Sequence, residues 1–192
     1  GPGWAVTLDK ALPVAAGLGG GSADAGAIFR MVKRAHGLPE NWQALAAGLG
    51  ADVPACVASR MCLGLGTGTD MYPVEDDLAG TPVLLVNPRV PLATGPVFRA
   101  WDGVDRGALP VGTASAIASA GRNDLEAPAI SLCPPIADVL AVLRQTGARL
   151  VRMSGSGATC FALYDDDAAL RRAAAAVAAA QPAWWQLSGA LR

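Results

Sequence analysis

At the centre of this sequence stands Pro13-Val-Ala-Ala-Gly17-Leu-Gly19-Gly20-Gly21-Ser22-Ala-Asp24, a glycine-dense turn that leads directly into an amphipathic segment. Each glycine raises the entropy that the chain loses on folding. Four glycines within five positions therefore indicate a backbone that adopts unusual torsion angles, or that lets another group such as a phosphate approach closely.

A helix is predicted directly after this turn. Apolar residues recur there with the spacing of one helix face, i, i+3, i+4 and i+7. The pattern predicts a helix that starts near Ser22 and closes at His36, with Gly37 just beyond its end. Such a helix points unpaired N–H groups and the positive end of its dipole into the turn. The residues alone therefore favour an anion site, with a tight strand-to-helix turn in a core as the alternative.

The common phosphate-loop templates do not fit the turn. The chain contains no Gly-Lys pair, which a Walker loop requires, and the dinucleotide fingerprint that starts at Gly17 has Ser22 where its third glycine belongs. The protein-kinase signatures, including His-Arg-Asp, are also absent.

Four stretches, in the right order, resemble the GHMP kinase superfamily. The turn, read as P-x3-G-L-G-G-G-S-x-D-A, is similar to the family's second motif, and its triple glycine is most similar to the 4-diphosphocytidyl-2-C-methyl-D-erythritol kinases. The other stretches are Gly50-Ala-Asp52-Val-Pro54, Asn123-Asp-Leu-Glu126 and Ser154-Gly-Ser-Gly157-Ala-Thr159. The resemblance covers nearly the whole chain.

The resemblance implies an α+β chain with the two-domain GHMP kinase fold, a truncated ribosomal-S5-like N-terminal domain followed by a ferredoxin-like C-terminal domain. Residues 1–65 would be the remainder of the N-terminal, ATP-binding domain, joined by 183–192, and residues 66–182 would form the C-terminal domain. We expect a kinase that lacks the N-terminal third of the family's fold, with the adenine contacts and a partner lysine upstream. Lys10, just before the turn, is not that lysine.

The resemblance also assigns candidate site residues. Asp52 would be the catalytic aspartate, which takes or orients the proton of the substrate hydroxyl; taken alone, it has the position of a helix N-cap. The expected ATP- and phosphate-binding residues are Pro13, Gly17, Leu18, Gly19, Gly20, Gly21, Ser22 and Ala23. The expected substrate and third-motif residues are Thr94, Phe98, Ser154, Gly155, Ser156 and Gly157. Taken alone, Phe98 is a core aromatic and the third motif a hairpin turn.

These roles imply a kinase that transfers phosphate from ATP to the 2-hydroxyl of 4-diphosphocytidyl-2-C-methyl-D-erythritol, in the non-mevalonate isoprenoid pathway. Mg²⁺ would enter as Mg-ATP, and the Ser22 hydroxyl would bind either the phosphate or this ion. Two alternatives stay open. One is another GHMP kinase, for homoserine or mevalonate, which usually carries G-L-G-S-S; the other is a non-catalytic fragment that binds anions. We expect the 192-residue chain itself to be inactive or weakly active.

Composition excludes other classes of function. The net charge is about −1 with scattered Lys and Arg, so the sequence shows no electrostatic footprint for nucleic acid. No apolar run approaches the length of a membrane span, and no signal peptide is visible. The four cysteines lack metal-site spacing and are expected to be buried free thiols. We expect a cytoplasmic enzyme, monomeric or homodimeric, that acts on a small molecule.

The remaining pattern predicts further elements. Strands are expected over 4–9 and 82–87, on both sides of the turn within 150–163, and over 184–187, where Trp184, Trp185 and Leu187 would be buried. Helices are expected over 40–49, over 123–143 and from 165–167 to 180. The helix over 123–143 is expected to be mostly architectural, with Pro134-Pro135 at its start or at a break. The glycine cluster at 64–69 is interpreted as a turn, and 102–121 as an exposed connection with a short Ala-rich helix.

Overall fold

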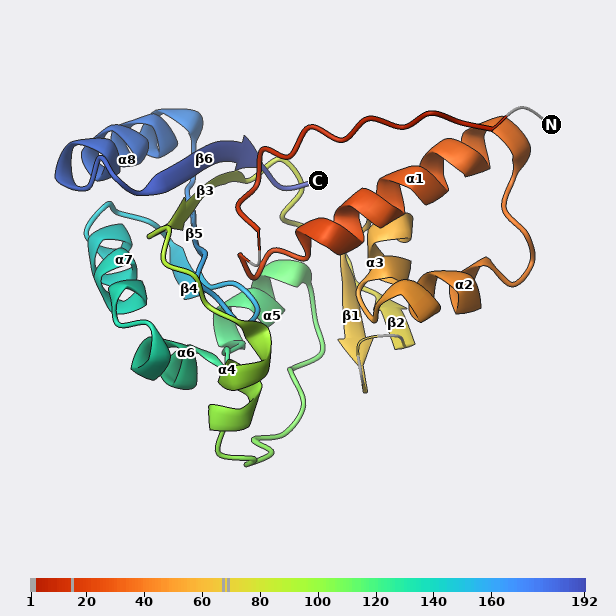
Figure 1. Cartoon of the computed structure of the whole chain (residues 1–192). Helices are drawn as coiled ribbons and strands as arrows, with labels where there is room; N and C mark the ends of the chain where they lie inside the picture. Colours follow the sequence, from red (N-terminus) through yellow and green to blue (C-terminus); the bar gives the residue numbers. More distant parts are fainter. Residues whose placement is uncertain (1–2, 15, 67, 69) are drawn as a thin grey trace.

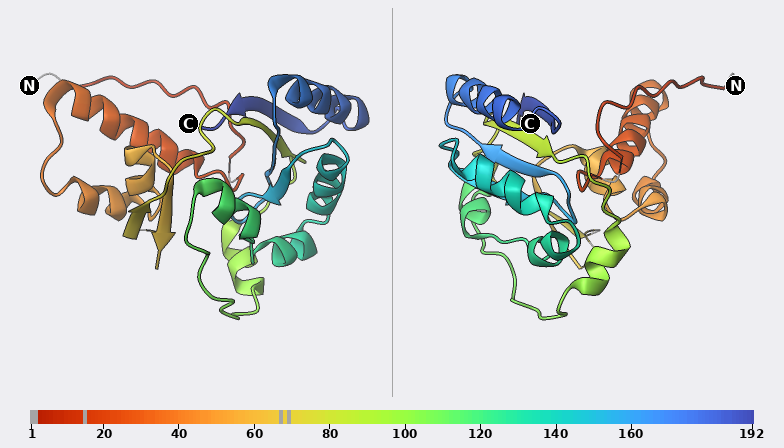
Figure 2. Two further views of the ribbon diagram at one scale, coloured as in Figure 1. Left: turned by 180° about the vertical axis from the view of Figure 1, so that it is seen from behind. Right: turned by 60° about the vertical axis from the view of Figure 1, so that its left-hand side comes forward.

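The structure is a computed structural model that describes residues 3–14, 16–66, 68 and 70–192. Its elements fall into two groups that lie at opposite ends of the molecule (Figures 1 and 2). One group contains three helices and a small hairpin, and the other contains a four-stranded sheet with helices packed on it. The chain is α+β, as the resemblance implied.

The first group packs around the helix that follows the glycine turn. Its elements are α1 (Gly20–His36), α2 (Trp42–Leu49), α3 (Val53–Ala58) and the antiparallel hairpin of β1 (Cys62–Leu65) and β2 (Asp70–Pro73). Ala46 and Val53 are fully buried between these helices, and Phe29 of α1 packs against them. Part of the predicted turn at 64–69 lies outside the described residues; residues 64 and 65 end β1, and Gly66 and Gly68 lie between the two strands of the hairpin.

The second group is a βαββαβ sheet. Its elements are β3 (Pro82–Asn87), α4 (Thr94–Ala100), α5 (Ala114–Ala120), α6 (Glu126–Leu132), α7 (Pro135–Arg144), β4 (Leu150–Met153), β5 (Cys160–Leu163), α8 (Asp167–Ala180) and β6 (Trp185–Ala190). The strand order is β4-β5-β3-β6 and every neighbouring pair is antiparallel, which is the ferredoxin-like arrangement.

The main core lies between this sheet and helices α7 and α8, which cover the same face. Alternate residues of β3, such as Leu84 and Val86, point into that core and are fully buried. The opposite face carries Val83 and Leu163, which pack against α5 in a smaller cluster. Burial on both faces explains why β3 is apolar from Pro82 to Val86.

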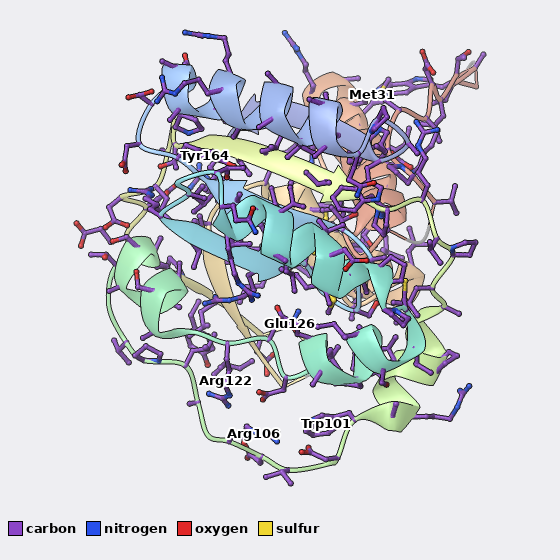
Figure 3. The ribbon with its side chains drawn as sticks, turned by 90° about the vertical axis from the view of Figure 1, so that its left-hand side faces the viewer. Met31, Trp101, Arg106, Arg122, Glu126 and Tyr164 are labelled. Carbon is purple, nitrogen blue, oxygen red and sulfur yellow. The ribbon has the colours of Figure 1, made fainter. Side chains whose placement is uncertain are left out.

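Several sequence predictions are confirmed. Helix α1 ends at His36 and Gly37 follows with a positive φ of 78°, although the helix starts at Gly20, slightly before Ser22. Asp166 caps α8 by accepting a hydrogen bond from the Ala169 N–H at 2.7 Å. The predicted helix over 123–143 is broken before Pro135 into α6 and α7. The first part of the connection at 102–121 is exposed, and the connection contains α5, which packs on the sheet; Figure 3 shows Arg106 on the exposed part, with Trp101 and Arg122 just beyond the two ends of the connection.

Three expectations are corrected. Residues 3–11 form an extended segment that runs along α1 instead of a strand, because none of the strands that the structure describes lies beside it to share hydrogen bonds (Figure 1). The end of the chain was expected beside the first group, but β6 pairs with β3 along its whole length. Leu187, expected to be buried, is 45% exposed because β6 is an edge strand. The domain boundary at 65 stays a prediction.

The thiols differ from one another in burial. Cys133 and Cys160 are buried in the main core, whereas Cys56 and Cys62 are only half-buried, so the expectation of buried free thiols holds for two of the four. In the part of the chain that the structure describes, no helix is both long enough and apolar enough to cross a membrane.

We expect opposite stability effects from two Gly→Ala substitutions in helices. A Cβ on Gly26 of α1 would lie 2.7 Å from the Cys56 carbonyl carbon of α3, so Gly26→Ala forces the two helices apart and should lower the free energy of unfolding by about 1–3 kcal/mol. A Cβ on Gly48 of α2 meets nothing within 4 Å, so Gly48→Ala should raise it by up to about 1 kcal/mol. Urea unfolding of both variants decides; a stabilising Gly26→Ala would contradict the close contact of α1 with α3.

Thiol reactivity should follow burial. Burial, followed by the negative charge of Glu126, raises the pKa of Cys160 to about 12, and burial also raises the pKa of Cys133. A raised pKa lowers the fraction of reactive thiolate, so at about pH 8 both thiols should resist alkylation in the folded protein and react in denaturant. Mass spectrometry after timed iodoacetamide treatment measures this; rapid native labelling of Cys160 would contradict the packing of β5.

Candidate functional site

A cleft of about 590 Å³ lies where the glycine turn meets the sheet-containing group. Most of the residues that sequence reasoning selected line it. They are Pro13, Gly17, Leu18, Gly19, Gly20, Gly21, Ser22, Asp52, Thr94, Phe98, Gly155 and Ser156. Ala23 and Ser154 instead line a second cleft behind the turn, and Gly157 is buried below its own turn. Residues from four separate motifs therefore meet at one place.

The turn presents the first N–H groups of α1 to the cleft. Gly17 and Gly19 have φ angles of 72° and 60°, a left-handed conformation that glycine adopts without a steric penalty. The first helical hydrogen bond runs from the Ala23 N–H to the Gly19 carbonyl at 2.8 Å, so the N–H groups before Ala23 have no partner within the helix. A Cβ on Gly21 would meet nothing within 4 Å, which leaves this end of the helix open to a ligand.

The turn is held in place by the third motif. The Ser154 hydroxyl donates to the Gly17 carbonyl at 2.8 Å, and the Thr159 N–H donates to the Ala16 carbonyl at 3.2 Å. A Cβ on Gly17 would lie 2.5 Å from the carbonyl oxygens of both Ser154 and Gly157. Only glycine allows two backbone segments to approach so closely, so the contact explains why Gly17 is required.

Asn123 supports the far side of the third motif, and sequence reasoning missed this role. Its side-chain amide donates to the Met153 carbonyl at 2.9 Å and to the Gly155 carbonyl at 2.8 Å. Its side-chain oxygen accepts from the Leu125 N–H at 3.0 Å. Asn123 belongs to a recognised family stretch, but a function for its side chain was not visible because the partners lie about 30 residues later.

Asp52 occupies the N-cap position of α3 but makes no capping hydrogen bond. Its backbone has helical torsions, φ −82° and ψ −12°, which turn the carboxylate away from the first-turn N–H groups. The side chain lines both clefts, and a Cβ on Gly19 would lie 3.8 Å from Asp52 Oδ2. The N-cap interpretation therefore gives the right position and the wrong contact, because the carboxylate stays available beside the start of α1.

The wall opposite α1 comes from α4. Thr94 begins this helix, and its hydroxyl lies 3.1 Å from the Ser156 hydroxyl, in hydrogen-bond contact. Phe98 lies one turn later and is 55% exposed, so the core interpretation of this aromatic residue is wrong. An exposed ring and two hydroxyl groups suit a ligand with a flat, apolar part and polar groups.

The cleft also contains residues that sequence reasoning did not choose. Lys10 lines it from the segment before the turn, Val14 from the turn itself, and Leu125 from the start of α6. The Lys10 ammonium forms an ion pair with Asp24 of α1. Among the described residues, no group of three or more His, Cys, Asp or Glu side chains is arranged to hold a metal ion.

Replacing Asn123 should weaken anion binding at the glycine turn more than it weakens the fold. Asn123→Asp keeps the side chain's shape but sets a carboxylate against the Met153 and Gly155 carbonyls, so the third-motif turn shifts and releases Gly17. We expect the dissociation constant for inorganic tripolyphosphate to rise about tenfold or more, as for a lost hydrogen bond plus repulsion between the carboxylate and the carbonyl oxygens. Calorimetry measures this, with Asn41→Asp, at the exposed start of α2, as the control. Equal tripolyphosphate affinity in both variants would contradict the positioning role.

Comparison with known proteins shows which family the chain resembles. Two family models match, "GHMP kinases N terminal domain" over residues 1–60 and "GHMP kinases C terminal" over residues 108–183. Among solved structures, a 4-(cytidine 5'-diphospho)-2C-methyl-D-erythritol kinase superposes with a TM-score of 0.77 at 33% identity, over 94% of this chain and 68% of that one. A homoserine kinase from Cytophaga hutchinsonii superposes with a TM-score of 0.70 at 18% identity, over 95% of this chain and 68% of that one, which shows the fold alone.

Curated relatives agree at higher identity. The 4-diphosphocytidyl-2-C-methyl-D-erythritol kinase of Novosphingobium aromaticivorans is 70% identical over the whole chain, which covers 66% of that relative. The kinase of the same name from Erythrobacter litoralis is 61% identical, over 97% of this chain and 70% of the relative. The chain thus spans about two thirds of the length of these relatives. It belongs to the GHMP kinases and, within them, to the family of the 4-diphosphocytidyl-2-C-methyl-D-erythritol kinases.

Proposed function

We propose that this chain carries the phosphate-binding loop, the catalytic aspartate and part of the acceptor wall of an ATP-dependent kinase. The acceptor is the 2-hydroxyl of 4-diphosphocytidyl-2-C-methyl-D-erythritol, a step of the non-mevalonate isoprenoid pathway. The observation that carries the proposal is the meeting of the glycine turn, Asp52, Thr94 and the third motif in one cleft. The names of the relatives supply the acceptor.

The residues present fit a nucleotide polyphosphate. Phosphoryl transfer leaves a protein mainly the tasks of in-line positioning and charge neutralisation. The first N–H groups of α1 supply donors and the positive end of a helix dipole, and Gly20 and Gly21 leave room for phosphate oxygens. The Ser22 hydroxyl and the Asp52 carboxylate are oxygen ligands of the kind that Mg²⁺ prefers. When bound, this ion would neutralise charge that develops on the phosphates.

Asp52 would act on the acceptor hydroxyl. Its carboxylate lies beside Gly19 and faces the cleft, so a hydroxyl placed between it and the loop would be oriented toward the terminal phosphate. The carboxylate would take the proton as the new O–P bond forms. The Thr94 and Ser156 hydroxyls would hold polar groups of the acceptor, and the exposed Phe98 ring would stack on its cytosine.

No observation favours the alternatives over this proposal. The likeness to homoserine kinase shows the fold alone, and the triple glycine at positions 19–21 departs from the G-L-G-S-S of that type. A cytoplasmic location follows for the proposed enzyme because ATP is its donor. The monomeric or homodimeric state stays a prediction.

Asp52→Asn should abolish most of the kinase activity. The amide keeps the shape of the side chain but cannot accept the hydroxyl proton, so kcat should fall by about 10²–10⁴ with little change in the KM for ATP. ADP release with 4-diphosphocytidyl-2-C-methyl-D-erythritol measures this in a chimera that joins the upstream residues of the Novosphingobium relative to this chain. Asp138→Asn, at an exposed position of α7, is the matched control and should leave kcat unchanged.

The same assay tests the identity of the acceptor and the activity of residues 1–192 alone. Residues 1–192 alone should turn over slowly at best, because they span about two thirds of the relatives' length. A chimera that phosphorylates homoserine but not the cytidine-containing acceptor would refute the proposal, and an Asp52→Asn variant with full activity would refute the role of this carboxylate.

A further inference from the structure

Lys10 places a positive charge directly over the start of α1. Its ammonium forms an ion pair with Asp24, in the second turn of the helix, and both side chains are about one third exposed, at 30% and 34%. A Cβ on Gly20 would lie 3.4 Å from Lys10 Nζ, so the ammonium lies next to the first turn of α1. Among the described residues that line the cleft, Lys10 is the only lysine or arginine.

Several N–H donors gather at this edge of the cleft. The positive end of the α1 dipole, its unpaired N–H groups and the Lys10 ammonium all gather at one edge of the cleft. The Asp24 carboxylate accepts from Lys10 on the helix side, and the Asp52 carboxylate lies beside Gly19. An ammonium carries three N–H donors, and the ion pair with Asp24 occupies one of them. The remaining donors can face an anion that also meets the first N–H groups of α1.

We propose that Lys10 binds the polyphosphate of the nucleotide donor and that Asp24 positions Lys10 for this contact. The inference rests on the proposed function for the identity of the donor. Phosphate oxygens at the start of α1 would have backbone N–H groups on one side and the ammonium on the other. Asp24 does not touch the ligand. It restricts the long Lys10 side chain before the ligand arrives, so less rotamer freedom is lost on binding.

Equilibrium binding by calorimetry tests the contact without turnover. The probes are ATP and inorganic tripolyphosphate, which lacks the nucleoside, so a phosphate contact must show with both. Lys10→Met should weaken both by about tenfold to a hundredfold, the range for one lost charge-assisted hydrogen bond, and Lys10→Arg should recover part of the loss. Lys33→Met is the matched control, because Lys33 is the second of two lysines in the chain and lies in the last turn of the same helix.

A double-mutant cycle tests the role of Asp24. Asp24→Asn should weaken tripolyphosphate binding by about threefold, less than a full charge contact gives, and should add nothing when Lys10→Met is already present. If the ion pair were only structural, each substitution would lower the melting temperature and leave both dissociation constants unchanged. Tighter binding by Asp24→Asn would overturn the positioning role, because the carboxylate would then act only by repelling phosphate.

Chemical labelling gives a second, direct readout. With two lysines in the sequence, reductive methylation followed by mass spectrometry resolves each amine. Tripolyphosphate should protect Lys10 and leave Lys33 reactive. Equal labelling of Lys10 with and without tripolyphosphate would overturn the inference, and so would an unchanged dissociation constant in folded Lys10→Met. If the unaltered chain still binds ATP in that case, the proposed function stands. Failure of the unaltered chain to bind either probe would overturn both.

Discussion

The geometry of the site depends on the contact between the Gly17 carbonyl and the Ser154 hydroxyl. Unpaired N–H groups at a helix start bind an anion only if the preceding loop aims them at it. Most residues of the loop are glycines, which have no side chain to fix its path, so the third motif fixes it, with its backbone so close to Gly17 that no Cβ would fit there. Asn123 in turn fixes the third motif. The path of the loop is therefore fixed by the sheet-containing group, although the N–H groups proposed to bind the ligand belong to α1.

A second close approach places the carboxylate. Gly26 brings α1 against the backbone of α3 at Cys56, and the two helices begin at the same cleft. Asp52 at the start of α3 therefore lies beside Gly19 at the start of α1. In the proposed reaction, the carboxylate would take a proton and the N–H groups would receive phosphate. Their separation is set by one packing distance between α1 and α3, which suits a reaction that depends on positioning.

The local sequence pattern predicted those helices and strands that can be recognised without knowing what they pack against. The family motifs predicted the residues that meet at the cleft. The apolar spacing of α1, the continuous apolar run of β3 and the acidic start of α8 each contain enough information locally. Alternation at residues 4–9 was misleading because a strand exists only with a neighbour, which the pattern of one segment cannot supply. The contacts of Asn123 and Lys10 were missed for a related reason: their partners lie far along the sequence, and a side chain's partner follows only from the fold.

The pairing of β6 with β3 has a consequence for synthesis. The ribosome releases β3, β4 and β5 well before residues 185–190, so until then β3 offers an unpaired row of N–H and C=O groups on an apolar strand. Such an edge is a template for pairing with another chain. The nascent protein therefore passes through a stage in which its future central strand is the one most prone to aggregation, and a chaperone or rapid completion of the chain would have to guard it.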